Sequence, residues 1–247
     1  MTNDPRSEPY YDYLTQSGYQ FFNYSEKHYI FEKGKRVIKV AKNIYNNAAT
    51  DESYYIEKAA HELLLFHHFP VVKIYNVYSK GDFLEDFVVL EEEKVDGKVY
   101  YKKNCENKFL TRALHLMQNA TSIKGKKFGM MDKDGQAKFS SWKECLYSVA
   151  ENMPEDERKS CCRNIETLPE VKEPSFVFTD CNMANFVFSG NSLIKAIDVE
   201  RPLWGDPSFL YGVIKSRNPY LYALIGKEAE SEIFDLYAKI YPYIFCG

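Results

Sequence analysis

Hydrophobic and polar positions alternate along the first part of the chain, from Tyr19 to Lys42. Such alternation is typical of strands that bury one face. Lys33-Gly34-Lys35 interrupts it and predicts a hairpin turn. Two further strand-like runs, 71–80 and 82–93, meet at Lys80-Gly81-Asp82. We therefore expect an antiparallel sheet of about five strands in this region.

One segment between these strands has helical spacing instead. Asp51 and Ser53 are candidate capping residues, and Pro70 ends the segment. Apolar side chains recur on one helix face, at positions 56, 59, 60, 63, 64 and 66. A single helix is therefore expected beside the sheet.

The rest of the chain is mostly helical in its pattern. Ser141 and Glu144 form a capping box before one of the helices. The exception is 185–197, where two apolar runs flank the polar turn 189–192 and predict a hairpin. Apolar residues return at helical spacing in four segments: 106–123, 140–152, 156–168 and 231–241.

These patterns predict an α+β protein with two lobes. Residues 1–93 would form a small, sheet-rich lobe with one helix, and residues 98–247 a larger, mainly helical lobe. The short polar stretch 94–97 would be the hinge crossing between them.

Composition supports a folded protein and excludes one class of partner. Of the 247 residues, 45% are hydrophobic, which is enough to bury a sizeable core. The net charge is −3, and the 32 basic and 35 acidic residues are mixed along the chain. Since nucleic-acid binding needs a basic field, no nucleic-acid partner is expected.

The cysteines and the start of the chain predict the compartment. The cysteines show neither CxxC pairs nor the spacing of a disulfide framework, and they stand at positions 105, 145, 161, 162, 181 and 246. The start resembles no signal peptide, and no apolar run approaches the length of a membrane span. We expect a cytoplasmic protein with reduced thiols and no membrane contact.

A small polar island separates two apolar runs in the stretch FVFTDCNMANFVF, residues 176–188. Its chemistry-bearing side chains are Asp180 and Asn185. Asp198 follows the strand LIKAI, 18 residues after Asp180. In the predicted hairpin Asn185 precedes one strand and Asp198 follows the other, so both are expected at the same end of the ribbon.

These residue types suit phosphoryl transfer. The reaction needs a carboxylate near the acceptor hydroxyl, oxygen ligands for Mg²⁺ and a cation on the donor phosphates. Asp180 can accept the proton of the acceptor, and Asn185 and Asp198 offer oxygen ligands of the kind that Mg²⁺ binds beside phosphate and water. A bare D-x-x-x-x-N pattern arises by chance in many chains, so the hypothesis depends on the motifs around it.

The stretch FTDCNMANFVF, followed by IKAIDVERPLWGDPSF, resembles the catalytic and metal-binding region of the aminoglycoside phosphotransferase and choline kinase-like group. That group of small-molecule relatives of the protein kinases typically has HGDxxxxN, a hairpin, IDWE and a GDP turn. The resemblance implies a bilobal, protein kinase-like fold with Asp180 as the catalytic residue and Asn185 and Asp198 as metal ligands. The segment 128–142 resembles one that the group carries before its catalytic loop.

The N-terminal part fits the same resemblance. Lys39 lies centrally in the apolar strand VIKV, where an unpaired ammonium would be costly. The group places its phosphate-binding lysine on such a strand and pairs it with a helix glutamate, for which Glu57 is our first choice and Glu62 the second. The strand FVVL leads into Glu91, Glu92 and Glu93, which resemble the hinge whose backbone would meet the adenine.

Three positions depart from the pattern of the group. Phe178 stands where the group usually has His. No glycine-rich loop precedes Lys39, and the turn at 23–27 is expected to cover the phosphates instead. Leu210 replaces an Asp that braces the catalytic loop in the group.

The resemblance implies a phosphotransferase that uses ATP (or GTP) and Mg²⁺ to phosphorylate a hydroxyl of a small molecule. The acceptor stays open among aminoglycoside-like, choline-like, sugar and amino-acid compounds, and so does the oligomeric state. One alternative is a protein kinase acting on a peptide, although HRD, DFG and APE motifs are absent. The other is a non-catalytic nucleotide-binding pseudokinase, which the departures favour and the presence of Asp180 disfavours.

Two further clusters have simple interpretations. His61, His67 and His68 lack partners at metal-ligand spacing and are expected at the surface near the helix end. The acidic positions 228, 230, 232 and 235 are expected on the solvated face of a helix. Attraction of a cationic acceptor is the alternative for this acidic run.

Overall fold

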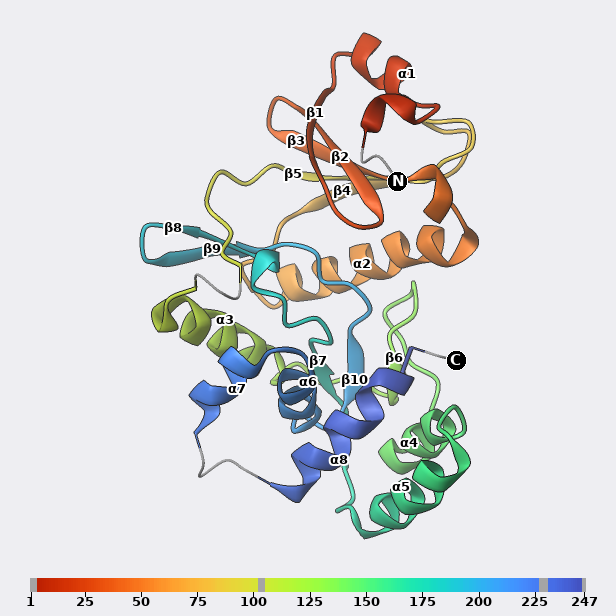
Figure 1. The fold of residues 1–247 in the computed structure, drawn as a ribbon, viewed down its shortest axis with the longest axis vertical. Helices are drawn as coiled ribbons and strands as arrows, with labels where there is room; N and C mark the ends of the chain where they lie inside the picture. The colour runs from red at the N-terminus through yellow and green to blue at the C-terminus, as the bar shows by residue number, and fades with distance from the viewer. Residues whose placement is uncertain (1–3, 102–104, 227–230, 246–247) are drawn as a thin grey trace.

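The computed structural model describes residues 4–101, 105–226 and 231–245. A sheet lies at one end of the molecule and a group of helices at the other (Figure 1). All neighbouring strands of this sheet are antiparallel, and their order is β1-β2-β3-β5-β4. The strands are β1 (Gln20–Tyr24), β2 (His28–Lys33), β3 (Arg36–Ala41), β4 (Ile74–Tyr78) and β5 (Val89–Glu93). The prediction of a five-stranded antiparallel sheet is confirmed.

Helices cover both faces of this sheet. The short helix α1 (Tyr11–Gln16), which the sequence pattern did not predict, buries Leu14 against one face together with Phe31 and Ile38. The long helix α2 (Ala48–Phe66) lies on the other face, where Tyr54 packs with Leu90. Because successive strand residues point to opposite faces, Ile38 faces α1 whereas Lys39 faces α2.

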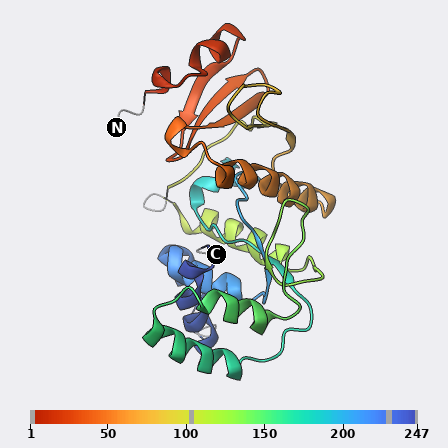
Figure 2. The ribbon, with the colours of Figure 1, turned by 90° about the vertical axis from the view of Figure 1, so that its right-hand side faces the viewer.

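Helix α2 belongs to the cores of both lobes. Its residues Ala60 and Leu64 are fully buried in the core of the helical lobe, whereas Tyr54 packs under the sheet. Figure 2 shows α2 between the sheet above and the helices below. The predicted lobes are therefore joined by packing along α2 as well as by the chain crossing after β5.

The helical lobe is built around a small sheet in the order β6-β10-β7. Its strands are β6 (Gly129–Met130), β7 (Ser175–Val177) and β10 (Leu203–Gly205), and the sequence pattern did not predict this sheet. The helices are α3 (Asn107–Ala120), α4 (Trp142–Ala150), α5 (Glu155–Thr167), α6 (Phe209–Arg217), α7 (Pro219–Ile225) and α8 (Glu232–Ile240). The expected helices α3, α4, α5 and α8 are present, and α6 and α7 are additional. Within the described ranges the chain also forms four short 3₁₀ turns: η1 (Pro5–Ser7), η2 (Asn43–Tyr45), η4 (Met183–Asn185) and η6 (Tyr241–Tyr243).

The predicted hairpin lies between the two lobes. Strands β8 (Phe186–Ser189) and β9 (Ser192–Ala196) pair with Phe186 opposite Ala196. The Val72 amide donates to the Ala196 carbonyl at 3.0 Å, and the Lys98 amide donates to the Phe188 carbonyl at 2.8 Å. The hairpin is thus fixed to the segments that leave α2 and β5.

Two expectations about the whole chain can be compared with the described residues. The five cysteines in these ranges form no disulfide, and Cys246 lies outside them. None of the helices in the same ranges has the length and apolar character needed to cross a membrane.

Candidate active site

Lys39 is the centre of a buried charge cluster between β3 and α2. Its side chain is only 6% exposed, and Nζ donates to Glu57 Oε1 at 2.9 Å and to Asp198 Oδ1 at 3.1 Å. Nζ also lies 3.4 Å from Glu92 Oε1. The structure places Glu57, the first choice for the helix partner, against Lys39, whereas Glu62 pairs with Lys58 at the surface.

The cluster contains more carboxylate than ammonium. Burial would lower the pKa of Lys39, but Asp198, Glu57 and Glu92 together raise it well above its ordinary value. Burial also raises the pKa of Glu57 and of Glu92, and Lys39 only partly offsets this effect. Glu92 Oε2 is buried and has no hydrogen-bond partner among the described residues. Three acidic side chains thus surround a single ammonium in this cluster.

Asp198 connects this cluster to the hairpin. The residue follows β9 and has φ +62°, in the left-handed region that L-residues rarely adopt. Its side chain is 33% exposed, and only Oδ1 accepts a hydrogen bond from the described residues, so Oδ2 remains available. Burial would raise the pKa of Asp198, but Lys39 lowers it below its ordinary value. Asp198 is therefore held ionised at the edge of the cluster.

Asp180 lies in the loop between β7 and η4 and is half-buried. Its Oδ1 accepts from the Asn182 amide, and its Oδ2 accepts from Asn185 Nδ2, both at 3.0 Å. The same Nδ2 lies 3.4 Å from the Asp198 carbonyl. Asn185 therefore joins the loop of Asp180 to the backbone of Asp198, and its amide oxygen is the atom left for a metal ion.

The residues that brace the Asp180 loop were not predicted. Leu210 is 1% exposed and packs in the core, so it cannot replace the hydrogen bonds of an Asp. Instead, Asn218 Nδ2 donates to the Cys181 carbonyl at 2.9 Å, and the Tyr241 hydroxyl donates to the Thr179 carbonyl at 2.8 Å. Asn218, between α6 and α7, is completely buried. The backbone on both sides of Asp180 is thus held by side chains from the C-terminal part of the chain.

His61 was expected at the surface, and this expectation was wrong. His61 is fully buried, whereas His67 and His68 are exposed as expected. Its Nε2 accepts from the Val199 amide at 3.2 Å, and its Nδ1 therefore donates to the Val72 carbonyl at 2.8 Å. Burial lowers the pKa of His61 to about 4, which keeps the ring neutral. One helical turn after Glu57, His61 thus fixes α2 to the residue that follows Asp198.

Glu91, Glu92 and Glu93 lie inside β5 rather than beyond it. Because β5 pairs with β3 on one side and with β4 on the other, the backbone of these residues already has partners in the sheet. This register does not support the expectation that their backbone meets an adenine.

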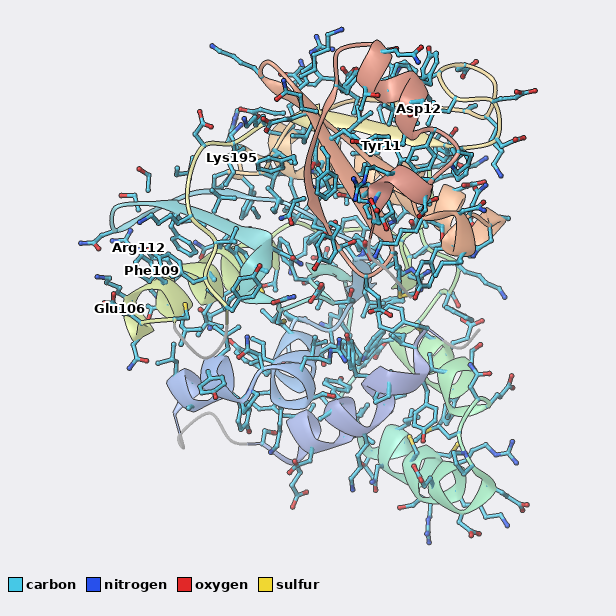
Figure 3. All side chains as sticks on the ribbon, turned by 45° about the horizontal axis from the view of Figure 1, so that its top comes forward. Tyr11, Asp12, Glu106, Phe109, Arg112 and Lys195 are labelled. Atoms are coloured by element: carbon cyan, nitrogen blue, oxygen red, sulfur yellow. The ribbon has the colours of Figure 1, made fainter. Side chains whose placement is uncertain are left out.

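The side chains of these glutamates bind cations. Glu91 pairs with Arg36 at 2.9 Å, and Glu92 contacts Lys39. Glu93 binds Lys195 of β9, which Figure 3 labels on the hairpin. The acidic run therefore links neighbouring strands and the hairpin.

The donor set fits Mg²⁺. The free oxygens of Asn185 and Asp198 are hard ligands that belong to the same end of the hairpin. Within the described ranges no group of three or more His, Cys, Asp or Glu side chains forms a metal site. A site with only two protein ligands suits Mg²⁺, which keeps waters and takes its remaining ligands from phosphate.

A cavity of about 400 Å³ opens beside Asp180. Lys27, in the turn between β1 and β2, borders it from the sheet side. Arg201 and Tyr241 line it from the helical side. The carboxylate of Asp180 thus faces a space that is large enough for a small molecule.

Comparison with known proteins identifies the fold. No family model matches the sequence, and no curated protein matches it. The structure of the aminoglycoside phosphotransferase APH(4)-Ia matches with a TM-score of 0.73 at 14% identity, over 94% of this chain and 88% of that chain. A thermostable mutant of APH(4)-Ia in a ternary complex with AMP-PNP and hygromycin B matches over the same shares of the two chains, with a TM-score of 0.73 at 15% identity.

A second type of aminoglycoside phosphotransferase matches less closely. The GDP and kanamycin complex of APH(2")-IIia has a TM-score of 0.55 at 14% identity, over 92% of this chain and 84% of that chain. The protein thus has a protein kinase-like fold. More particularly, the fold is that of the aminoglycoside phosphotransferases, as the sequence resemblance implied.

Proposed function

We propose that the protein is a small-molecule kinase that transfers the γ-phosphoryl group of ATP, or of GTP, to a hydroxyl. One observation carries the proposal: Asn185 contacts both Asp180 and Asp198, and Asp198 contacts Lys39. A candidate base, two candidate metal ligands and a phosphate-binding cation are thereby linked by direct contacts. The nucleotide complexes of the structural neighbours, with AMP-PNP and with GDP, support a nucleotide ligand.

Each residue has a role that its surroundings support. Asp180 orients the acceptor hydroxyl and accepts its proton. Asn185 and Asp198 would hold Mg²⁺, which when bound neutralises charge on the phosphates. Lys39, fixed by Glu57, contacts the donor phosphates. Since the backbone of Glu91 to Glu93 is paired within the sheet, the adenine of the nucleotide would instead meet the segment that follows β5.

A non-catalytic nucleotide-binding protein is the second candidate. The absence of a glycine-rich turn before Lys39 favours it, since such a turn would hold the phosphates close. The braced loop disfavours it, because a protein that only binds nucleotide has no need of a fixed carboxylate at Asp180. A peptide acceptor has no observation in its favour.

The test is ADP formation from Mg·ATP by the wild-type protein and by Asp180→Asn. The acceptor panel comprises aminoglycosides, choline, amino sugars, sugar acids and hydroxylated amino acids. We expect at least one compound to stimulate turnover, and the variant to lose about 10²–10⁴-fold in kcat while it still binds nucleotide. Asp12→Asn is the matched control, because Asp12 is exposed on α1, away from the site (Figure 3). Equal turnover in Asp180→Asn and wild type would refute the proposal.

A further inference from the structure

The charged side chains around the cavity beside Asp180 are mostly basic. Lys27, Arg201 and Arg217 line it, against the acidic residues Asp180 and Glu200. The lining thus carries three basic side chains and two acidic ones.

Arg201 is held in the cavity wall by an unusual backbone conformation. Its φ of +46° lies in the left-handed region, which is costly for a residue with a side chain. The Thr179 hydroxyl donates to the carbonyls of Glu200 and Arg201, at 3.3 and 2.8 Å. Thr179 directly precedes Asp180, so one hydroxyl ties the backbone of Arg201 to the loop of Asp180.

The side chain of Arg201 has no acidic partner within the described part of the chain. Its guanidinium lies 6.0 Å from the centre of the Phe245 ring, and no ion pair to a described carboxylate is formed. A half-buried guanidinium is an effective ligand for carboxylate and phosphate groups, because it offers paired donors in a fixed geometry. Arg201 is thus available to an anionic ligand.

The residues on the two sides of the cavity are expected to contact different substrates, the phosphate donor and the phosphate acceptor. Lys27 lies in the turn that is expected to cover the donor phosphates. Arg201 and Arg217 come from the helical lobe, as do Tyr241 and Phe245, and Lys39 is not among the residues that line the cavity. The arginines therefore belong to the acceptor side.

The acidic run near the C-terminus does not offset the basic charge of this cavity. Glu232 and Asp235 line a different cavity, between α5 and α8, and Asp235 pairs with Lys215. Positions 228 and 230 lie outside the described residues. Glu232 and Asp235, at least, do not draw a cationic acceptor toward Asp180.

We propose that the phosphate acceptor is a small hydroxy compound with an anionic group, which Arg201 binds while Asp180 faces the hydroxyl. This inference rests on the proposed function and narrows it. A polyamine acceptor such as an aminoglycoside would place its ammonium groups against a basic wall, which is unfavourable in a partly desolvated site. A hydroxy acid or a hydroxy phosphate would instead place its anionic group against these basic side chains.

Binding of charge-matched probes tests the proposal. One series is glycerate, glycerol 3-phosphate, glycerol and serinol, and the other is gluconate, glucose 6-phosphate, glucose and glucosamine. Calorimetry on the protein saturated with Mg·AMP-PNP measures their affinities. We expect an anionic member to bind at least about tenfold more tightly than its neutral and cationic counterparts, and Arg201→Gln to abolish that preference. Comparison of the affinities of the carboxylate and phosphate probes then shows which anionic group the site prefers.

Arg163→Gln is the matched control, because Arg163 is exposed on α5, outside the cavity. It should leave the preference unchanged. Tighter binding of the cationic members, a preference that survives Arg201→Gln, or no binding by any anionic member would overturn the proposal. Loss of AMP-PNP affinity in Arg201→Gln, with the probe preference intact, would instead assign Arg201 to the donor and equally overturn it.

The assay of ADP formation, compared with the binding measurements, separates this inference from the proposed function. An anionic probe that binds through Arg201 but gives no Asp180-dependent ADP would contradict the phosphotransferase and leave the binding class in place. A cationic compound phosphorylated in an Asp180-dependent reaction would support the phosphotransferase and refute the anionic acceptor.

Discussion

Asn218 gives the clearest test of how the loop of Asp180 is held. Its side chain is completely buried, donates to the Cys181 carbonyl at 2.9 Å and accepts from the Leu221 amide at 3.2 Å. Asn218→Asp keeps the shape and the acceptor but removes the donor, which leaves the Cys181 carbonyl unsatisfied and facing an acidic oxygen. One unsatisfied buried group costs about 1–3 kcal/mol. Asn218→Ala removes both bonds, and its cost is about 2–5 kcal/mol.

Urea unfolding measures these costs, and steady-state kinetics measures their effect on the reaction. We expect kcat to fall in Asn218→Asp, because the Asp180 loop loses a support, whereas nucleotide binding is kept. Asn164→Ala is the control, since Asn164 is exposed on α5. If Asn218→Asp were as stable as the wild type within about 0.5 kcal/mol and equally active, the loop would not depend on this hydrogen bond.

Three further predictions follow from the buried charges. Lys39→Met leaves three carboxylates in this cluster without their cation. We expect the free energy of unfolding in urea to fall by about 3–5 kcal/mol. An unchanged free energy of unfolding would show that the carboxylates are protonated. Burial lowers the pKa of His61 from 6.5 to about 4, so the unfolded state binds the proton first as the pH falls. The contribution of His61 to stability is therefore complete above pH 6.5 and is lost as the pH drops toward 4. His28 has a similar pKa of about 4 and would contribute in the same direction. His61→Gln should therefore reduce this pH dependence without abolishing it, and an unchanged dependence would exclude His61 as a cause. Asp198→Ala should remove the Mg²⁺ dependence of nucleotide binding in calorimetry, and an unchanged affinity for Mg·ATP would argue against its metal role.

The parts of the site that the sequence predicted are those whose signals are local or have strong periodicity. Asp180, Asn185 and Asp198 flank one hairpin, so the strand pattern alone placed Asn185 and Asp198 at one end of it. Lys39 stood out because a lysine in the middle of an apolar strand needs a partner. The resemblance implied a helix glutamate as this partner, and Glu57 lies in the middle of the predicted helix.

The parts that were missed depend on contacts between distant segments. His61 looks like an ordinary helix residue, because its partners Val72 and Val199 come from other parts of the chain. Asn218 has no sequence signal for its bond to Cys181, 37 residues away.

Short elements and charged strands were missed for another reason. The strands of the β6-β10-β7 sheet have only two or three residues each, which is too short for a periodic pattern. The run Glu91–Glu93 resembles a hinge that follows the strand FVVL, whereas cations from β3 and from the hairpin allow it to lie inside β5. Tertiary pairing overrode the local preference here.

The most direct test of the central claim is a double-mutant cycle in kcat on Asp180 and Asn185, with the acceptor that stimulates turnover of Mg·ATP. The two side chains are joined by a 3.0 Å hydrogen bond and would act as one unit. We predict a loss of about 10²–10⁴-fold for Asp180→Asn and little further loss when Asn185→Ala is added. Losses that multiply as for independent residues, or a fully active Asp180→Asn, would contradict a shared catalytic site at this end of the hairpin.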